Sequence, residues 1–358
     1  MSALVAPRAL RVGPLSWLVP WRAGAVTALL LALLGFLVAL DLSVGDVRIP
    51  LGDVARTLLG GGEPFQEFIV LDLRLPQTAV ATLVGAALGL SGALTQTFAR
   101  NPLASPDILG VTQGAALGAV AVIVLSGAGG FGGGLAEGRL QQLGLPVAAF
   151  AGAMLTAGLL YVLSWRRGID GQRLVLIGIG IGAALTACVS WLLVSARIQD
   201  AASAQLWLNG SLSSRGWEQA TPVIVALVIL LPVSLVLVRN LNALQLGDES
   251  ARGLGVRLQL TQLLVLVVAV GLAAVSVSAV GPLEFVAFVV PQLAIRLTGG
   301  SRPPLLASMV MGSCLVVGAD LVTRVVIPFP LPAGLVTAAL GAPYLIWLLL
   351  RTNRKVSA

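Results

Sequence analysis

The chain has 358 residues, of which 57% are hydrophobic and only 10% are charged, whereas a soluble domain carries roughly 25% charged residues. So few charged side chains cannot cover a water-exposed surface, and the mean hydropathy of +0.98 excludes a soluble globular protein. Histidine is absent, and the two cysteines, Cys188 and Cys314, lie within apolar runs. Histidine catalysis, a histidine or cysteine metal site and a disulfide framework are therefore excluded. The composition predicts a polytopic membrane protein.

Ten segments are apolar enough to cross a bilayer, whose hydrocarbon core of ~30 Å requires about 20 residues of helix. The predicted spans are 23–42, 77–98, 107–126, 145–164, 174–195, 220–238, 259–279, 283–298, 304–322 and 333–350. The first span is too long for the apolar region of a signal peptide, so we expect it to be retained. The sequence therefore predicts an all-α fold with ten transmembrane helices.

The distribution of charged residues predicts the orientation of these spans. With the N-terminus in the cytoplasm, 15 of the 22 basic residues but only four of the 15 acidic residues fall on the cytoplasmic side. This agrees with the positive-inside rule, and one span more or fewer would reverse every loop beyond it. Both termini are therefore expected in the cytoplasm. The net charge of +7 then reflects topology and requires no nucleic-acid partner.

No segment resembles an independent soluble domain, so we expect a single transmembrane domain over residues 1–358. Its cytoplasmic parts are a tail at 1–22, a loop at 239–258 and a tail at 351–358. The chain has no glycine-rich nucleotide-binding loop with a lysine. It is therefore not expected to bind a nucleotide by that route.

Two observations favour transport over catalysis. Asn101-Pro102-Leu103 after span two is matched by Gly281-Pro282-Leu283 after span seven, which indicates an inverted repeat of spans 2–5 and 7–10, a pattern typical of transporters. Ionisable residues that serve proton transfer usually lie inside the membrane. Here the nearest candidates, Asp320 and Glu284, are predicted close to the outer surface, so energy for uphill transport would come from another protein.

Residues 100–107 join spans two and three and contain Pro102 and Pro106. Two prolines in five residues forbid a continuous helix, and non-helical backbone at the membrane must be satisfied by protein or by a water-filled cavity. One interpretation is a gate at the inner mouth of a pathway. The other is a tight turn in which Asp107 caps the next helix.

Residues 241–256 (LNALQLGDESARGLGV) form a cytoplasmic loop. We expect Asp248 to cap a short helix that carries Arg252 and ends near Gly255. Two short amphipathic helices in this loop would make a docking surface for a cytoplasmic partner. The alternative, an interfacial helix on lipid headgroups, is disfavoured by the adjacent acids Asp248 and Glu249.

Two further segments depart from plain apolar helices. Pro291 lies inside span eight and predicts a kinked helix, which either lines a pathway or only relieves packing. Residues 207–211 (WLNGS) predict an outer re-entrant turn or, equally, a tryptophan anchor at the membrane interface.

Together these segments resemble the FecCD-type family of vitamin B12 and iron–siderophore ABC-importer permeases. The resemblance is carried by RLPxT from Arg74, RNPLASPDILGVTQGA from Arg100, LGDESARGLGV from Leu246, GPLEFVAFVVPQ from Gly281, Ala319-Asp320 and LPAGLVTAALGAPYLIWLLL from Leu331. It extends from about residue 40 to the end of the chain. Together with RGIDGQRLVLIGIGIGA from Arg167, the 105–115 segment is most similar to the ferric-enterobactin branch of the family.

The resemblance implies a type II importer fold in which two related permease subunits work with two cytoplasmic ATPases and an external binding protein. ATP and Mg²⁺ would bind to the ATPases, so this chain is expected to hold no cofactor and to be no enzyme. The pathway would be lined by spans two, five, eight and ten.

The resemblance also implies roles for individual residues. Arg74 and Arg324 would dock the binding protein on the outside. The pathway and its gate would include Asn101, Pro102, Leu103, Asp107, Gly110, Pro291 and Gln292. Coupling to the ATPase would rest on Leu246, Gly247, Asp248, Glu249, Ala251, Arg252, Leu254 and Gly255.

Three positions depart from the family pattern. Gln77 replaces an arginine, Gln292 replaces a histidine, and Glu284 replaces a small residue. An acid beside the route of an anionic ferric catecholate would be unfavourable unless it is paired. Glu284 therefore bears on the substrate and leaves the fold untouched.

We therefore expect a multi-pass subunit of the bacterial cytoplasmic membrane that imports a ferric siderophore of the enterobactin-like catecholate class, as half of a heterodimer. The alternatives are a permease for another iron chelate, haem or cobalamin, a proton-driven carrier, and a membrane scaffold that transports nothing.

Overall fold

Each of the ten predicted spans corresponds to one helix of the computed structural model, which describes residues 9–12, 15–18, 21–45, 47–125, 135–165, 171–325 and 331–356. These helices are α1 (Trp21–Ser43), α4 (Leu75–Ala99), α5 (Val111–Leu125), α6 (Leu135–Ser164), α7 (Gly171–Ser195), α9 (Trp217–Leu244), α11 (Leu258–Val280), α12 (Val286–Thr298), α13 (Leu305–Val325) and α14 (Ala333–Val356). The fold is helical, as predicted from the lengths of the apolar runs.

Seven of the described helical stretches are long and apolar enough to cross a membrane. Two apolar helices, α5 (111–125) and α12 (286–298), are shorter than a full span, and the apolar part of α14 covers 333–347. A short helix reaches across the hydrocarbon only together with the non-helical segment beside it. The count of ten spans and the cytoplasmic position of both termini stay predictions.

Short elements join the long helices. They are α2 (Leu51–Leu58), α3 (Pro64–Glu67), the π-helical turn η1 (Phe68–Arg74), α8 (Ile198–Leu208) and α10 (Asp248–Gly253). A short antiparallel hairpin of β1 (Ala9–Val12) and β2 (Leu15–Leu18), which the sequence does not predict, precedes the helical bundle. In the sequence Gly13 and Pro14, residues typical of turns, separate the two strands. Arg167–Asp170 of the family-like segment lie outside the described residues.

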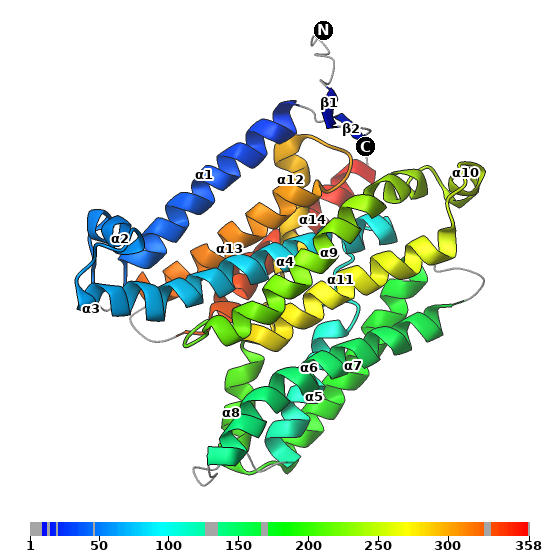
Figure 1. The fold of residues 1–358 in the computed structure, drawn as a ribbon. Helices are drawn as coiled ribbons and strands as arrows, with labels where there is room; N and C mark the ends of the chain where they lie inside the picture. Colours follow the sequence, from blue (N-terminus) through cyan, green and yellow to red (C-terminus); the bar gives the residue numbers. More distant parts are fainter. Residues whose placement is uncertain are drawn as a thin grey trace.

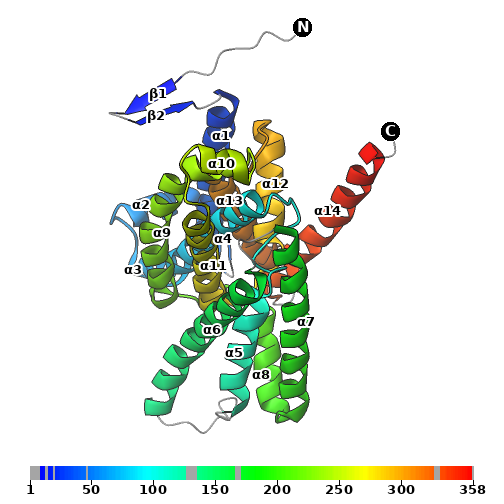
Figure 2. The ribbon, with the colours of Figure 1, turned by 90° about the vertical axis from the view of Figure 1, so that its right-hand side faces the viewer.

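Helix α4 is the buried centre of the bundle, with α13, α9, α11 and α12 packed around it (Figure 1). Helices α5 to α8 form a second group, and α14 leans away from the rest toward its C-terminal end (Figure 2). Glycines allow the closest approaches at the centre. A Cβ atom on Gly85 would lie 2.4 Å from the carbonyl oxygen of Gly312 in α13, and one on Gly92 would lie 1.8 Å from that of Ala287 in α12. Helix backbones in membranes associate closely through such small residues.

Replacing Gly85 with leucine is expected to destabilise the protein by about 3 kcal/mol, because α13 would have to move away from α4. The matched control is Gly35→Leu in α1, where an added Cβ would meet no packed neighbour within 4 Å. The melting temperatures of the two detergent-solubilised variants are the measurement. Equal melting temperatures would show that the α4–α13 contact does not limit stability.

Candidate functional site

The segment between α4 and α5 runs into the bundle instead of crossing its surface. Residues 101–110 are non-helical, and they follow α7 along its length: Gly171 lies against Ala99, whereas Gly178 lies against Leu109. An α-helix rises 1.5 Å per residue, so the segment advances about 10 Å along α7. Its backbone is thereby enclosed by protein, the condition under which non-helical chain is tolerated at membrane depth.

Gate residues predicted from the sequence lie on this segment. The side-chain oxygen of Asn101 accepts a hydrogen bond from the backbone N–H of Leu103 at 2.9 Å, and Leu103 packs beside Phe288 and Val289 of α12. Pro102 is exposed. Gly110 has a φ of +83° and lies against Gly178 and Gly182 of α7, so a larger residue there would be strained.

The carboxylate of Asp107 lies beside the start of α5. One oxygen accepts the hydroxyl of Thr112 at 2.7 Å, and the other is buried without a hydrogen-bond partner. Glu284, predicted on the opposite side of the membrane, lies near enough to act electrostatically on Asp107. The linker between α11 and α12, which carries Glu284, therefore lies close to the 101–110 segment. The side of the membrane that each acid faces stays a prediction.

The proline kink of α12 faces α4. Pro291 has no N–H, so the carbonyl of Ala287, four residues earlier, loses its helical partner. That carbonyl is the atom against which Gly92 of α4 packs. Next to it, the side-chain amide of Gln96 donates to the Phe288 carbonyl at 2.9 Å, and Gln292 donates to the Gln96 oxygen at 2.6 Å. These hydrogen bonds tie α4 to α12 one residue beyond the carbonyl that the proline frees.

The WLNGS segment closes the other end of α12. Trp207 is only 9% exposed, so it is no interfacial anchor in this chain. Gly210 has a φ of +60°, and a Cβ there would lie 1.9 Å from the Pro282 carbonyl oxygen, while Ser211 donates its N–H to Val280 at 2.9 Å. The turn therefore packs against the linker that carries Glu284.

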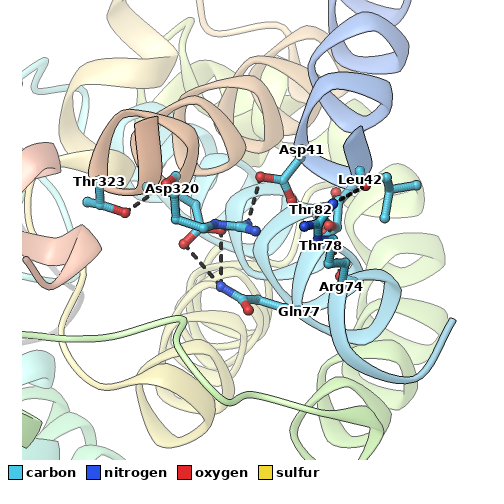
Figure 3. Close-up of polar contacts among 9 residues, drawn as sticks. Asp41, Leu42, Arg74, Gln77, Thr78, Thr82, Asp320 and Thr323 are labelled. Atoms are coloured by element: carbon cyan, nitrogen blue, oxygen red, sulfur yellow. Dashed lines mark hydrogen bonds and ion pairs between the residues drawn. The ribbon is translucent and has the colours of Figure 1, made fainter. Parts of the chain in front are cut away.

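A buried ion-pair network lies where α1, α4 and α13 meet (Figure 3). Arg324 donates to Asp41 at 2.7 Å and also pairs with Asp320, while its Nε is buried without a partner. Gln77 donates to both oxygens of Asp320, at 3.4 and 3.2 Å, and Thr78 donates to Asp41. Two carboxylates thus share one guanidinium, and the neutral donors Gln77 and Thr78 add hydrogen bonds that such buried charges require.

Arg74 is held at the end of α1. Its guanidinium donates to the carbonyls of Leu42, at 2.8 Å, and Val47, and a Cβ on Gly45 would lie 2.7 Å from it. A helix end leaves its last carbonyls unsatisfied, so Arg74 fixes the exit of the chain from α1. A side chain at Gly45 would displace the guanidinium from this position.

Both predicted docking arginines therefore have partners within the chain. Arg74 is 7% exposed, and the side chain of Arg324 is 21% exposed. Docking through them stays a prediction, and it requires that these internal contacts be exchanged for contacts with the partner.

The 241–256 loop, predicted on the cytoplasmic side, has one short helix instead of two. Helix α10 begins with Asp248 and ends at Gly253, and its N-cap is Gly247 with a φ of +102°. Asp248 is therefore the first helical residue and does not cap the helix. Such a position still favours an acid, because it lies at the positive end of the helix dipole.

Among the side chains of α10 that the structure describes, one is buried, and exposed apolar residues flank the helix. Ala251 is fully buried, whereas Leu246 and Leu254 are 66% and 65% exposed. Glu249 and Arg252 are exposed on the same helix, and Gly255 has a φ of +79°. Exposed leucines beside charged residues are typical of a contact surface.

Sequence reasoning gives no structural role to three polar residues, one each in α1, α4 and α12. The sequence argument uses Asp41 only as part of the end of span one. An acid within an apolar run could have indicated a functional or paired residue. Gln96 gives no signal, because a single amide in a helix has no distinctive pattern. Arg296 contributes to the sequence argument only as a positive-inside charge.

Known proteins match this chain over most of its length. A model of the FecCD transport family matches residues 31–351. The chain is 37% identical to the ferric enterobactin transport system permease protein FepG of Escherichia coli, over 87% of this chain and 91% of that protein. It is 37% identical to the Fe(3+) dicitrate transport system permease protein FecD of Escherichia coli (87% and 94%). It is 35% identical to the vitamin B12 import system permease protein BtuC of Klebsiella pneumoniae (93% and 94%).

A solved structure has the same fold. It is described as an inward-facing conformation of a metal-chelate type ABC transporter, and it matches with a TM-score of 0.79 and 27% sequence identity. The match covers 92% of this chain and 99% of the solved one.

Proposed function

The chain belongs to the FecCD transport family and is a multi-pass permease of an ABC importer for iron chelates or vitamin B12, and we propose that its substrate is a ferric siderophore of the catecholate class. The relative with this substrate in its name, the ferric enterobactin permease, covers 87% of the chain. The relatives named for dicitrate and vitamin B12 are of similar identity, so the substrate requires its own test.

The inward-turned segment 101–110 carries the proposal of a pathway. Two plain membrane-spanning helices could be joined without a segment that enters the bundle. The backbone of this non-helical segment is tolerated only where protein or a cavity encloses it. The segment joins α4 to α5 and contacts α7 and α12. Movement of any of these helices would move the segment, as expected for a gate.

We propose that transport proceeds by alternating access, powered from outside the chain. A second related permease subunit completes the pathway, and two cytoplasmic ATPases bind ATP and Mg²⁺. The α10 segment transmits their motion to α9 and α11, which it joins. A loaded binding protein docks on the outer side through Arg74 and Arg324. The chain itself performs no chemistry and requires no cofactor.

Uptake of labelled substrates in cells that lack only this chain tests the proposal. Ferric catecholate, ferric hydroxamate and cobalamin are offered in parallel, and the gene is then restored. Loss confined to the catecholate is the expected result. Loss confined to another substrate would retain the importer and correct its substrate, and unchanged uptake of all three would contradict the siderophore assignment.

An uncoupler separates the ATP-driven mechanism from a proton-driven carrier. The carboxylate that such a carrier would require is represented by Asp107, which has one buried oxygen without a partner. Uptake that continues in uncoupler-treated vesicles supplied with internal ATP supports the importer. Uptake that stops there, or proceeds without the ATPases, would favour the carrier.

A further inference from the structure

Arg296 is an arginine that neither the docking nor the coupling of the proposed function uses. It lies in the last turn of α12. Its guanidinium carbon lies 4.1 Å from the ring centroid of Trp347 and 5.3 Å from that of Tyr344, both on α14. The two rings pack together with centroids 5.7 Å apart. The cation is thus held by aromatic faces, a favourable arrangement for arginine.

Polar groups in this cluster are left without hydrogen bonds. Nη1 of Arg296 is buried without a partner, and so is the hydroxyl of Tyr344. Within the described residues, no carboxylate forms an ion pair with Arg296. Arg74 and Arg324, by contrast, donate to carbonyls or carboxylates. A buried donor without a partner is unfavourable, so this cluster is suited to bind a hydrogen-bond acceptor.

The cluster lies beside the proposed gate, at the end of α12 that faces the cytoplasm in our topology. Arg22, at the start of α1, donates to the carbonyl of Leu297 at 3.0 Å, which places the end of α12 next to the N-terminal end of α1. Tyr344 packs in the same apolar cluster as Leu103 of the gate segment. A solute that passes Leu103 toward the cytoplasm would therefore meet Arg296.

We propose that Arg296, Tyr344 and Trp347 form an anion-recognition site that contacts the ferric catecholate as it leaves the pathway. This inference rests on the proposed function and names the residues that recognise the charge of the substrate. A ferric tris-catecholate is trianionic, its phenolate oxygens accept hydrogen bonds, and its rings are aromatic. The N–H edge of a guanidinium matches paired oxygens, while its face stays on Trp347. A neutral hydroxamate chelate would gain much less from the same group.

The test uses the complete transporter, with both permeases, the ATPases and the binding protein, in vesicles of zwitterionic lipid and, in a parallel series, in vesicles that also contain an anionic lipid. Initial uptake of ferric enterobactin and of a neutral ferric hydroxamate is measured for the wild type, Arg296→Gln, Arg296→Lys and Arg22→Gln. Arg22→Gln is the matched control, because it removes an arginine that bonds the same end of α12. The loss of one hydrogen bond between charged groups is expected to lower the uptake rate about tenfold or more.

We expect Arg296→Gln to lower catecholate uptake about tenfold, with Arg296→Lys in between and Arg22→Gln close to the wild type. Hydroxamate uptake, where it occurs, should change less than twofold. If Arg296→Gln does not accumulate, Arg296→Lys and Trp347→Leu carry the comparison, since both retain a cation.

Other outcomes would overturn the inference. Equal losses for both chelates would make Arg296 a structural residue, and a loss seen only with anionic lipid would identify a lipid headgroup as the occupant. A wild type that carries only neutral chelates would refute anion recognition while leaving the importer intact. A wild type that carries no chelate at all would refute the proposed function as well.

Discussion

Replacing Arg324 with glutamine is expected to lower the stability of the protein by about 3 kcal/mol or more, because it leaves Asp41 and Asp320 buried without a counter-charge. Both carboxylates lie almost completely inside the protein, and the guanidinium is their shared partner. The hydrogen bonds from Gln77 and Thr78 remain in the variant but carry no charge. The melting temperature of the solubilised protein measures the loss.

A triple variant, Asp41→Asn, Arg324→Gln and Asp320→Asn, is the matched control. It replaces every charge of the network with a neutral amide, so no buried carboxylate is left without a counter-charge and most of the lost stability should return. A triple variant as unstable as Arg324→Gln would show that the arginine stabilises the fold through contacts other than these ion pairs.

The same triple variant tests docking separately from folding. It is expected to fold but to offer no cation at position 324, so its affinity for the loaded binding protein should fall at least tenfold. Unchanged affinity would assign Arg324 a purely structural role. The internal partners also predict that Asp41→Asn alone strengthens docking, since one of the two carboxylates that compete for the guanidinium is then neutral.

The helices could be predicted from the sequence because bilayer thickness fixes their length. All ten apolar runs are helices in the structure. Helix α6 is longer than its predicted span, because it begins at Leu135 and not at residue 145. The N-terminal hairpin escapes prediction, since eight residues in strands carry too little periodicity beside an apolar span.

The unusual residues of the site could be identified from the sequence, but their contacts in the folded chain could not be predicted. Pro102 and Pro106 indicate that the helix stops, yet the depth reached by residues 101–110 depends on glycines of α7 that lie far along the chain. Likewise, Asp41 and Arg324 are 283 positions apart, and no local pattern connects them. Long-range packing decides which charges become partners, so the sequence predicts exposed docking arginines where the structure has paired ones.

Reversing the charge of Asp248 and Glu249 with lysine is expected to reduce uptake more than tenfold while the protein stays in the membrane. The two acids begin α10, and the exposed leucines that flank this helix form the proposed contact with the ATPase. Charge reversal at such a surface opposes docking of a partner that fits the original charges. Uptake and ATP hydrolysis are measured on the same membranes. Uptake should fall while hydrolysis continues, and hydrolysis should no longer depend on the loaded binding protein.

Glu218→Lys provides the control for this variant. Glu218 is exposed in the first turn of α9, at the opposite end of that helix from α10, so lysine there loses the same helix-dipole interaction of about 0.3–1 kcal/mol. It should leave uptake within twofold of the wild type. If both variants lose uptake equally, the loss reflects helix stability and α10 is not the coupling element. If only the α10 variant does, the motion of the ATPases reaches the pathway through Ala251, the fully buried residue that attaches α10 to the bundle.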